Sequence, residues 1–107
     1  DSNDSSSVKG ASMLVPAPVN ENTKAIFQQS KKYGQVVLNA LTKEVGMQNR
    51  GVVERGDMTG FNWSKVPVIL VEMGFLSNPD EDRLLGTEDY QNRIALALAD
   101  GIIEALK

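Results

Sequence analysis

The sequence predicts an α/β protein with a twisted, mostly parallel sheet that is flanked by helices in three layers. The strongest indication is the uninterrupted apolar run Val66–Val71, which is typical of a strand buried on both faces. Such strands belong to parallel sheets that helices cover on either side. Segments with helical spacing of apolar residues precede and follow this run. We therefore expect residues 67–72 to form a strand that is central in the sheet.

The N-terminal part of the chain predicts a mobile segment followed by a short strand. Residues 1–10 are rich in Ser and Asp and have little that packs, so we expect them to be flexible. Residues 11–107 then form the folded domain. A short strand is expected at 11–17, where Pro16 and Pro18 restrict it to a sheet edge or make it end there.

A long helix is predicted next. Asn20 or Asn22 supplies the N-terminal cap, and Gly46 ends the helix as a residue just past the C-terminus. Gly34 lies inside it and marks either a kink near Ser30 or a close approach between helix and sheet. The apolar positions at helical spacing are Ile26, Tyr33, Val37, Leu41 and Val45.

Further strands and helices are expected along the rest of the chain. A second short strand is predicted at 52–57, followed by a loop at 58–65. After the apolar strand, Asn78 caps a short helix with Pro at its first position, and Gly86 ends it. Thr87 begins the last helix. Its apolar stripe repeats every four residues: Tyr90, Ile94, Leu98, Ile102 and Leu106.

Composition excludes several classes of protein. The 107 residues carry a net charge of −3, and the only adjacent basic pair is Lys31-Lys32, so nothing indicates a nucleic-acid-binding surface. No apolar stretch is long enough to span a membrane, and no signal peptide is visible. The chain contains no His and no Cys, so we expect no catalytic zinc site built from its own residues.

Glu72 is the strongest candidate for a catalytic residue. It ends the apolar strand and is followed by Gly74, and ligands of open α/β sheets bind beyond the carboxyl ends of strands. A carboxylate at this place serves as a general acid or base. The structural alternative is that Glu72 caps a helix or pairs with Arg50 or Arg83.

The segment around Glu72 resembles the signature of the zinc-dependent N-acetylmuramoyl-L-alanine amidases, which cleave peptidoglycan. In that family a Pro-apolar-Leu-Val-Glu-x-Gly-Phe-x-Ser/Thr-Asn segment carries a catalytic glutamate, which matches Glu72. The resemblance extends over essentially the whole chain. It includes Ser6–Ser12, the Arg-Gly segment Gly46–Val52, and helices at 80–85 and 90–106.

The resemblance implies an activity and a cofactor. The reaction is hydrolysis of the amide bond between N-acetylmuramic acid and the L-alanine of the stem peptide, with Glu72 as general base and acid. The family binds zinc through two histidines and one glutamate, which we expect N-terminal to residue 1 and absent from this chain. The chain is then the C-terminal part of a catalytic domain that is truncated at its N-terminus and inactive when isolated. An extracellular or cell-wall location, as for an autolysin, follows from the resemblance alone.

Three other side chains are candidates for substrate contacts. Arg50 is expected in a helix-to-strand turn, directly before Gly51. It would bind a muropeptide carboxylate or lactyl oxygens through its planar fork, although an ion pair with Glu44 or Glu54 is the favoured alternative. Phe61 and Trp63 would stack on sugar rings, or would cover the edge of the sheet, which is the favoured interpretation of the pair.

Several functions therefore remain open from the sequence. The first is the glutamate-bearing part of a peptidoglycan amidase, and the second is a non-catalytic amidase-like module for regulation or cell-wall binding. The third is an adhesion fragment, suggested only by Arg55-Gly56-Asp57, a tripeptide that arises easily by chance. Peptidoglycan is the expected partner. We also expect the chain to pack against the missing N-terminal half of the domain or against a second copy of itself.

Overall fold

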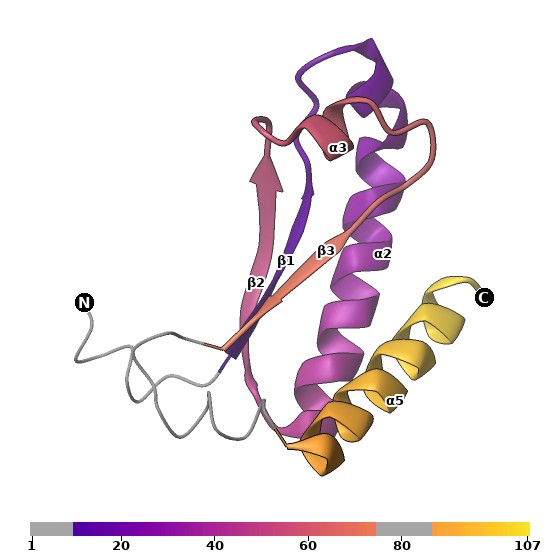
Figure 1. The fold of residues 1–107 in the computed structure, drawn as a ribbon. Coiled ribbons are helices and arrows are strands. Elements are labelled where there is room, and N and C mark those ends of the chain that lie inside the picture. The colour runs from indigo at the N-terminus through magenta and orange to yellow at the C-terminus, as the bar shows by residue number, and fades with distance from the viewer. Residues whose placement is uncertain (1–9, 75–86) are drawn as a thin grey trace.

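The computed structural model describes residues 10–74 and 87–107, which form a small sheet with two long helices beside it (Figure 1). The helix predicted after Asn78 lies outside the described residues. Of the segment expected to be flexible, only Gly10 is described, and it belongs to a strand. The elements are β1 Gly10–Pro16, α2 Glu21–Val45, β2 Gln48–Arg55, α3 Thr59–Asn62, β3 Leu70–Met73 and α5 Glu88–Ala105.

The predicted α/β class is confirmed, and the sheet that carries it is mixed. Its order is β2-β1-β3, with β1 parallel to β2 and antiparallel to β3. β1 is thus central, and its proline stands at its end. The pairing with β3 stops at Leu14, so the missing N–H of Pro16 falls beyond that ladder. Ala17 still donates to the carbonyl of Arg55 on the β2 side, at 2.9 Å.

The prediction that residues 67–72 form a central strand is wrong for the described sheet. β3 begins only at Leu70 and lies at an edge. Its side chains alternate between two environments: Ile69 and Val71 pack against the core, whereas Leu70 is 43% exposed. An apolar run therefore does not establish burial on both faces, because here the described helices cover only one of them (Figure 1).

The predicted long helix is confirmed at both ends. Asn20 is the cap: its side chain accepts from the Thr23 backbone N–H at 2.8 Å, and the Thr23 hydroxyl accepts from the Asn20 N–H in return. Gly46 ends the helix in the left-handed conformation, with φ of 81°. Gly34 marks a close approach to the sheet, because a Cβ there would lie 3.0 Å from Met13.

The core lies between the sheet and the two long helices. Its buried members include Ala11, Met13, Val15, Val37, Leu38, Leu41, Tyr90, Ile94 and Ala97. The last helix begins after Thr87 as predicted, but its buried line is Tyr90, Ile94, Ala97 and Gly101. An α-helix has 3.6 residues per turn, so apolar residues that repeat every four positions shift gradually around the helix. Ile102 and Leu106 therefore lie exposed on its flank.

Candidate functional site

Glu72 lies on the face of the sheet opposite α2 and α5. Successive side chains of a strand point to opposite faces, and the helix face of β1 holds Met13 and Val15. Ser12 therefore points away from the helices, and its cross-strand partner is Glu72. The Glu72 side chain is exposed among the described residues. We call this surface the open face.

The backbone that carries Glu72 is fixed by the ladder with β1. The pairing continues past the last residue of β3, where Gly74 donates its N–H to the carbonyl of Gly10 at 2.9 Å. Glu72 is thus held close to the end of its strand, as predicted. Because β1 and β3 are antiparallel, the end of β3 lies beside the beginning of β1.

Arg50 lies in a bulge of β2, and not in a turn before that strand. β2 begins at Gln48, four residues earlier than predicted, and its register with β1 shifts between Ala11 and Met13. Gly51 has φ of 93°, which a residue with a side chain adopts only at a cost. Its N–H donates to the Asn49 side-chain oxygen at 2.9 Å. The bulge lets the strand change register while it continues the parallel pairing.

The bulge places Arg50 on the open face together with Glu72. A Cβ built on Gly10 would lie 2.9 Å from Arg50 Cδ, so the arginine crosses the beginning of β1. Gly10 and Ser12 share a face of β1, and that face is the open one. Glu72, Ser12 and Arg50 thus form a row across β3, β1 and β2. With strands spaced about 4.8 Å apart, the outer backbones of the row lie roughly 10 Å apart.

One of the ion pairs expected for Arg50 is absent from the described residues. Glu54 lies on the helix side and pairs with Lys31 of α2, with 3.4 Å between the charged atoms. Arg83, the other candidate partner of Glu72, lies outside the described residues. The row was not predicted as a unit, since neither the antiparallel register of β3 nor the bulge has a sequence signal strong enough to place these three residues side by side. Ser12 was missed altogether.

A second arginine of the open face is neutralised by its own neighbour. Arg55 donates Nε and Nη2 to the two carboxylate oxygens of Asp57, both at 2.8 Å. The hydrogen bond with Asp57 raises the pKa of Arg55, and the charge of Glu72 adds to the effect. The same hydrogen bond lowers the pKa of Asp57. Two of the three residues of the adhesion-like tripeptide are therefore engaged with each other.

The two aromatic candidates have different environments. Phe61, on α3, is buried, in keeping with the interpretation that it covers the sheet. Trp63 follows α3 and is 75% exposed. The loop that carries it is held by Asn22, whose side chain donates to the carbonyls of Asn62 and Ser64. Trp63 thus remains available for an external contact, whereas Phe61 does not.

The described residues do not fit a zinc ion. Among residues 10–74 and 87–107, no group of three or more His, Cys, Asp or Glu side chains converges on one point. The whole chain lacks His and Cys, the usual nitrogen and sulfur ligands of catalytic zinc. Any such ion would need ligands from another polypeptide segment.

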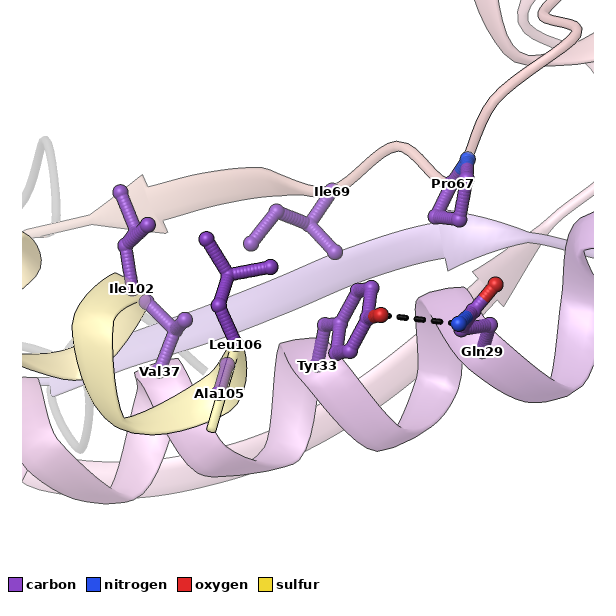
Figure 2. Close-up of a pocket in the computed structure, with 8 residues that line it drawn as sticks. All are labelled: Gln29, Tyr33, Val37, Pro67, Ile69, Ile102, Ala105 and Leu106. Carbon is purple, nitrogen blue, oxygen red and sulfur yellow. Dashed lines mark hydrogen bonds between the residues drawn. The ribbon is translucent and has the colours of Figure 1, made fainter.

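The helix side of the sheet holds an apolar groove, shown in Figure 2. It lies where the end of α5 meets α2 and the segment leading into β3, and has a volume of about 450 Å³. Its lining is Gln29, Tyr33, Val37, Pro67, Ile69, Ile102, Ala105 and Leu106. Its two polar side chains are hydrogen-bonded to each other, since Gln29 Nε2 donates to Tyr33 Oη at 2.8 Å. The side chains that surround the groove are otherwise aliphatic.

No helix within residues 10–74 and 87–107 is both long and apolar enough to span a membrane.

Comparison with known proteins identifies the family. The model of Amidase_3, described as N-acetylmuramoyl-L-alanine amidase, matches residues 1–104. The chain belongs to this family, which confirms the resemblance seen around Glu72. Among curated relatives, the amidase AmiC of Neisseria meningitidis serogroup B is 35% identical over 78 residues, which is 73% of this chain and 18% of AmiC.

Solved amidase structures share the fold. The CwlD amidase of Clostridioides difficile, solved in complex with the GerS lipoprotein, superimposes with a TM-score of 0.79 at 33% identity, covering 94% of this chain and 48% of CwlD. The catalytic domain of CwlV from Bacillus (Paenibacillus) polymyxa gives a TM-score of 0.70 at 30% identity, covering 95% of this chain and 51% of that domain. The chain thus spans about half the length of the solved amidases that it matches.

Proposed function

We propose that this chain supplies the glutamate-bearing part of a peptidoglycan amidase. The bond cleaved is the amide between N-acetylmuramic acid and the L-alanine of the stem peptide. The observation that carries the proposal is the position of Glu72: it lies near a strand end on the open face, in a chain that belongs to the amidase family over nearly its full length. A cell-wall or extracellular location accompanies this substrate.

Glu72 would act as the proton carrier of the reaction. Its carboxylate takes a proton from the attacking water, and the protonated acid then gives that proton to the nitrogen of the leaving L-alanine. The water oxygen bonds to the lactyl carbonyl carbon and the C–N bond breaks. The lactyl group is released as a carboxylic acid whose proton passes to the freed amine, and Glu72 returns to its starting carboxylate. Zinc is proposed from the resemblance alone, with ligands outside the described residues.

Arg50 would bind the substrate beside this glutamate. Its guanidinium donates two parallel hydrogen bonds to a carboxylate, and stem peptides carry carboxylates. The row across the sheet supports this role, because Arg50 and Glu72 share the open face at one end of it. The lactyl oxygens are the other acceptors within the same substrate.

A non-catalytic amidase-like module is the second candidate function. The observation that favours it is the lack of His and Cys in the chain, which leaves the described residues without a zinc site. Such a module would bind peptidoglycan or regulate an active amidase through the same face. It would release no peptide when zinc and the remaining amidase segments are present.

Replacing Glu72 by Gln in the complete zinc-loaded enzyme tests the catalytic proposal. Glutamine keeps the size of the side chain but cannot accept the proton, so we expect kcat to fall by about 10²–10⁴-fold with little change in KM. Zinc content, measured by metal analysis, should stay the same. The matched control is Glu54→Gln, a carboxylate of the same sheet that pairs with Lys31 on the other side. Full activity of the Glu72 variant would overturn the catalytic role of Glu72, whereas a zinc-loaded parent that releases no peptide would favour the non-catalytic module.

We also propose that the apolar groove binds another segment of the amidase domain. The chain corresponds to about half of CwlD, and the groove lies beside β3, an edge strand of the described sheet. An edge strand that exposes an apolar side chain, as β3 does with Leu70, and that lies beside an apolar groove is a typical place for another segment to pack. A second copy of the chain is the alternative occupant.

Charge placed in the groove tests this packing. Leu106 lines the groove and is 69% exposed, whereas Ile103 is equally apolar and exposed but does not line it. We expect Leu106→Glu to weaken association with the complementary segment by at least about tenfold, and Ile103→Glu to leave it unchanged. Sedimentation velocity of the chain alone separates the two occupants, because self-association appears without any added segment. A monomer that binds no such segment would contradict the proposal.

A further inference from the structure

Ser12 and Glu72 face each other across the antiparallel pair. Gly74 donates to Gly10, and the ladder alternates in steps of two, so Ser12 and Glu72 form a hydrogen-bonded pair of residues. Such pairs have Cα atoms about 5.5 Å apart and side chains on the same face. The short hydroxyl of serine and the longer carboxylate of glutamate can therefore meet without any change of backbone.

Neither side chain makes a hydrogen bond or a close ion pair in the described part of the chain. Within residues 10–74 and 87–107, the Ser12 hydroxyl makes no hydrogen bond, and the Glu72 carboxylate makes no hydrogen bond or close ion pair. Ser12 is partly buried on the central strand, a position that usually favours a β-branched or aromatic residue. Its neighbour on the same face, Leu14, is buried. A serine at this place contributes little packing, so its hydroxyl is the feature to explain.

We propose that Ser12 is the positioning residue for Glu72. Its hydroxyl donates a hydrogen bond to the carboxylate and holds it at one orientation on the open face, ready to accept the proton. The inference rests on the proposed function, since it assigns a partner to the general base. Among the described residues, the charged side chains that the strands place on this face beside Glu72 are Arg50 in the row and Arg55, whose charge is paired with Asp57.

Two substitutions of Ser12, by side chains of nearly the same shape, test the hydroxyl alone. Ser12→Thr keeps it and Ser12→Val removes it, so any packing effect on the strand is shared by both. In the complete zinc-loaded amidase, we expect Ser12→Val to have a kcat about tenfold below that of Ser12→Thr, with KM within about twofold. The acidic limb of the kcat/KM profile should lie at higher pH in the valine variant, because a carboxylate that loses a donor protonates more readily.

Glu72→Gln, measured alongside, separates the role of Ser12 from the proposed function. Loss of activity in that variant together with equal kcat and equal pH profiles for the threonine and valine variants would overturn the role of Ser12 and leave the proposed function intact. A rise in KM alone on loss of the hydroxyl would likewise overturn it, since Ser12 would then contact substrate. Retained activity of Glu72→Gln would instead overturn the proposed function.

Discussion

The helix-covered face and the open face are built from alternate residues of the same strands, yet only one of them is a packed core. On the helix side, Met13 and Val15 are fully buried under α2 and α5. On the open side, Ser12 and Glu72 present polar side chains beside Leu70, which is largely exposed. The comparison indicates that one face stabilises the sheet, while the other holds the residues of the proposed site.

The difference also explains how Glu72 is held. The backbone of β3 is paired along one edge with β1, whose other side is packed against the helices. The strands that carry Glu72 are therefore stabilised by packing on the helix side, and the Glu72 side chain does not contribute to that packing. Active-site side chains on a rigid scaffold have this arrangement in general.

The largest stability difference between the faces is expected for two leucines. Leu38 of α2 is fully buried, so Leu38→Ala should lower the free energy of unfolding by about 2–5 kcal/mol. Leu70→Ala on the open face should cost less than about 1 kcal/mol. Urea unfolding followed by circular dichroism measures both. Equal losses would mean that another segment covers the open face in solution, and the comparison of the two faces would fail.

Much of the helix-covered side followed from the sequence. Asn20, Gly46 and Thr87 mark their helix ends through local hydrogen bonds and backbone conformations, which a few neighbouring residues determine. Of the two alternatives expected for Gly34, the structure has the close helix–sheet approach. Side-chain periodicity and capping are properties of short segments, so sequence alone describes them well.

The open side was harder to predict because it depends on pairing between distant segments. The apolar run of residues 67–72 indicated a strand, but its direction and edge position are set by which strand it meets. The bulge at Gly51 moved Arg50 from the expected turn onto β2. Glu72 became a candidate through its motif, whereas Ser12 became one only once the register was known.

A smaller effect, on the KM for substrate, is expected for Arg50 of the open face. Arg50→Ala should raise KM for muropeptides by roughly 10–100-fold with a modest change in kcat, since a charge-assisted pair to the substrate is lost. Arg50→Lys should restore only part of the affinity, because lysine lacks the planar fork. Arg93→Ala is the control, an exposed arginine of α5 whose guanidinium lies 5.9 Å from the Tyr90 ring centre. Equal KM values for the two alanine variants would remove Arg50 from the substrate site.

The smallest effect, on the stability of the fold, is expected for Asp57, which follows β2 at the border of the open face. The hydrogen bond from Arg55 lowers the pKa of Asp57 in the folded protein, so the ionised carboxylate stabilises the fold. That contribution is fully present above the pKa of an unfolded aspartate, about 3.9, and is lost as the pH falls through the lower folded pKa. Asp57→Asn should therefore be slightly less stable than the parent at pH 7, and the difference should shrink toward pH 2. Both side chains are exposed and screened by solvent, so the effect is small. Thermal unfolding of the two proteins at several pH values measures it, and a difference that grows on acidification would contradict the assigned role of this pair.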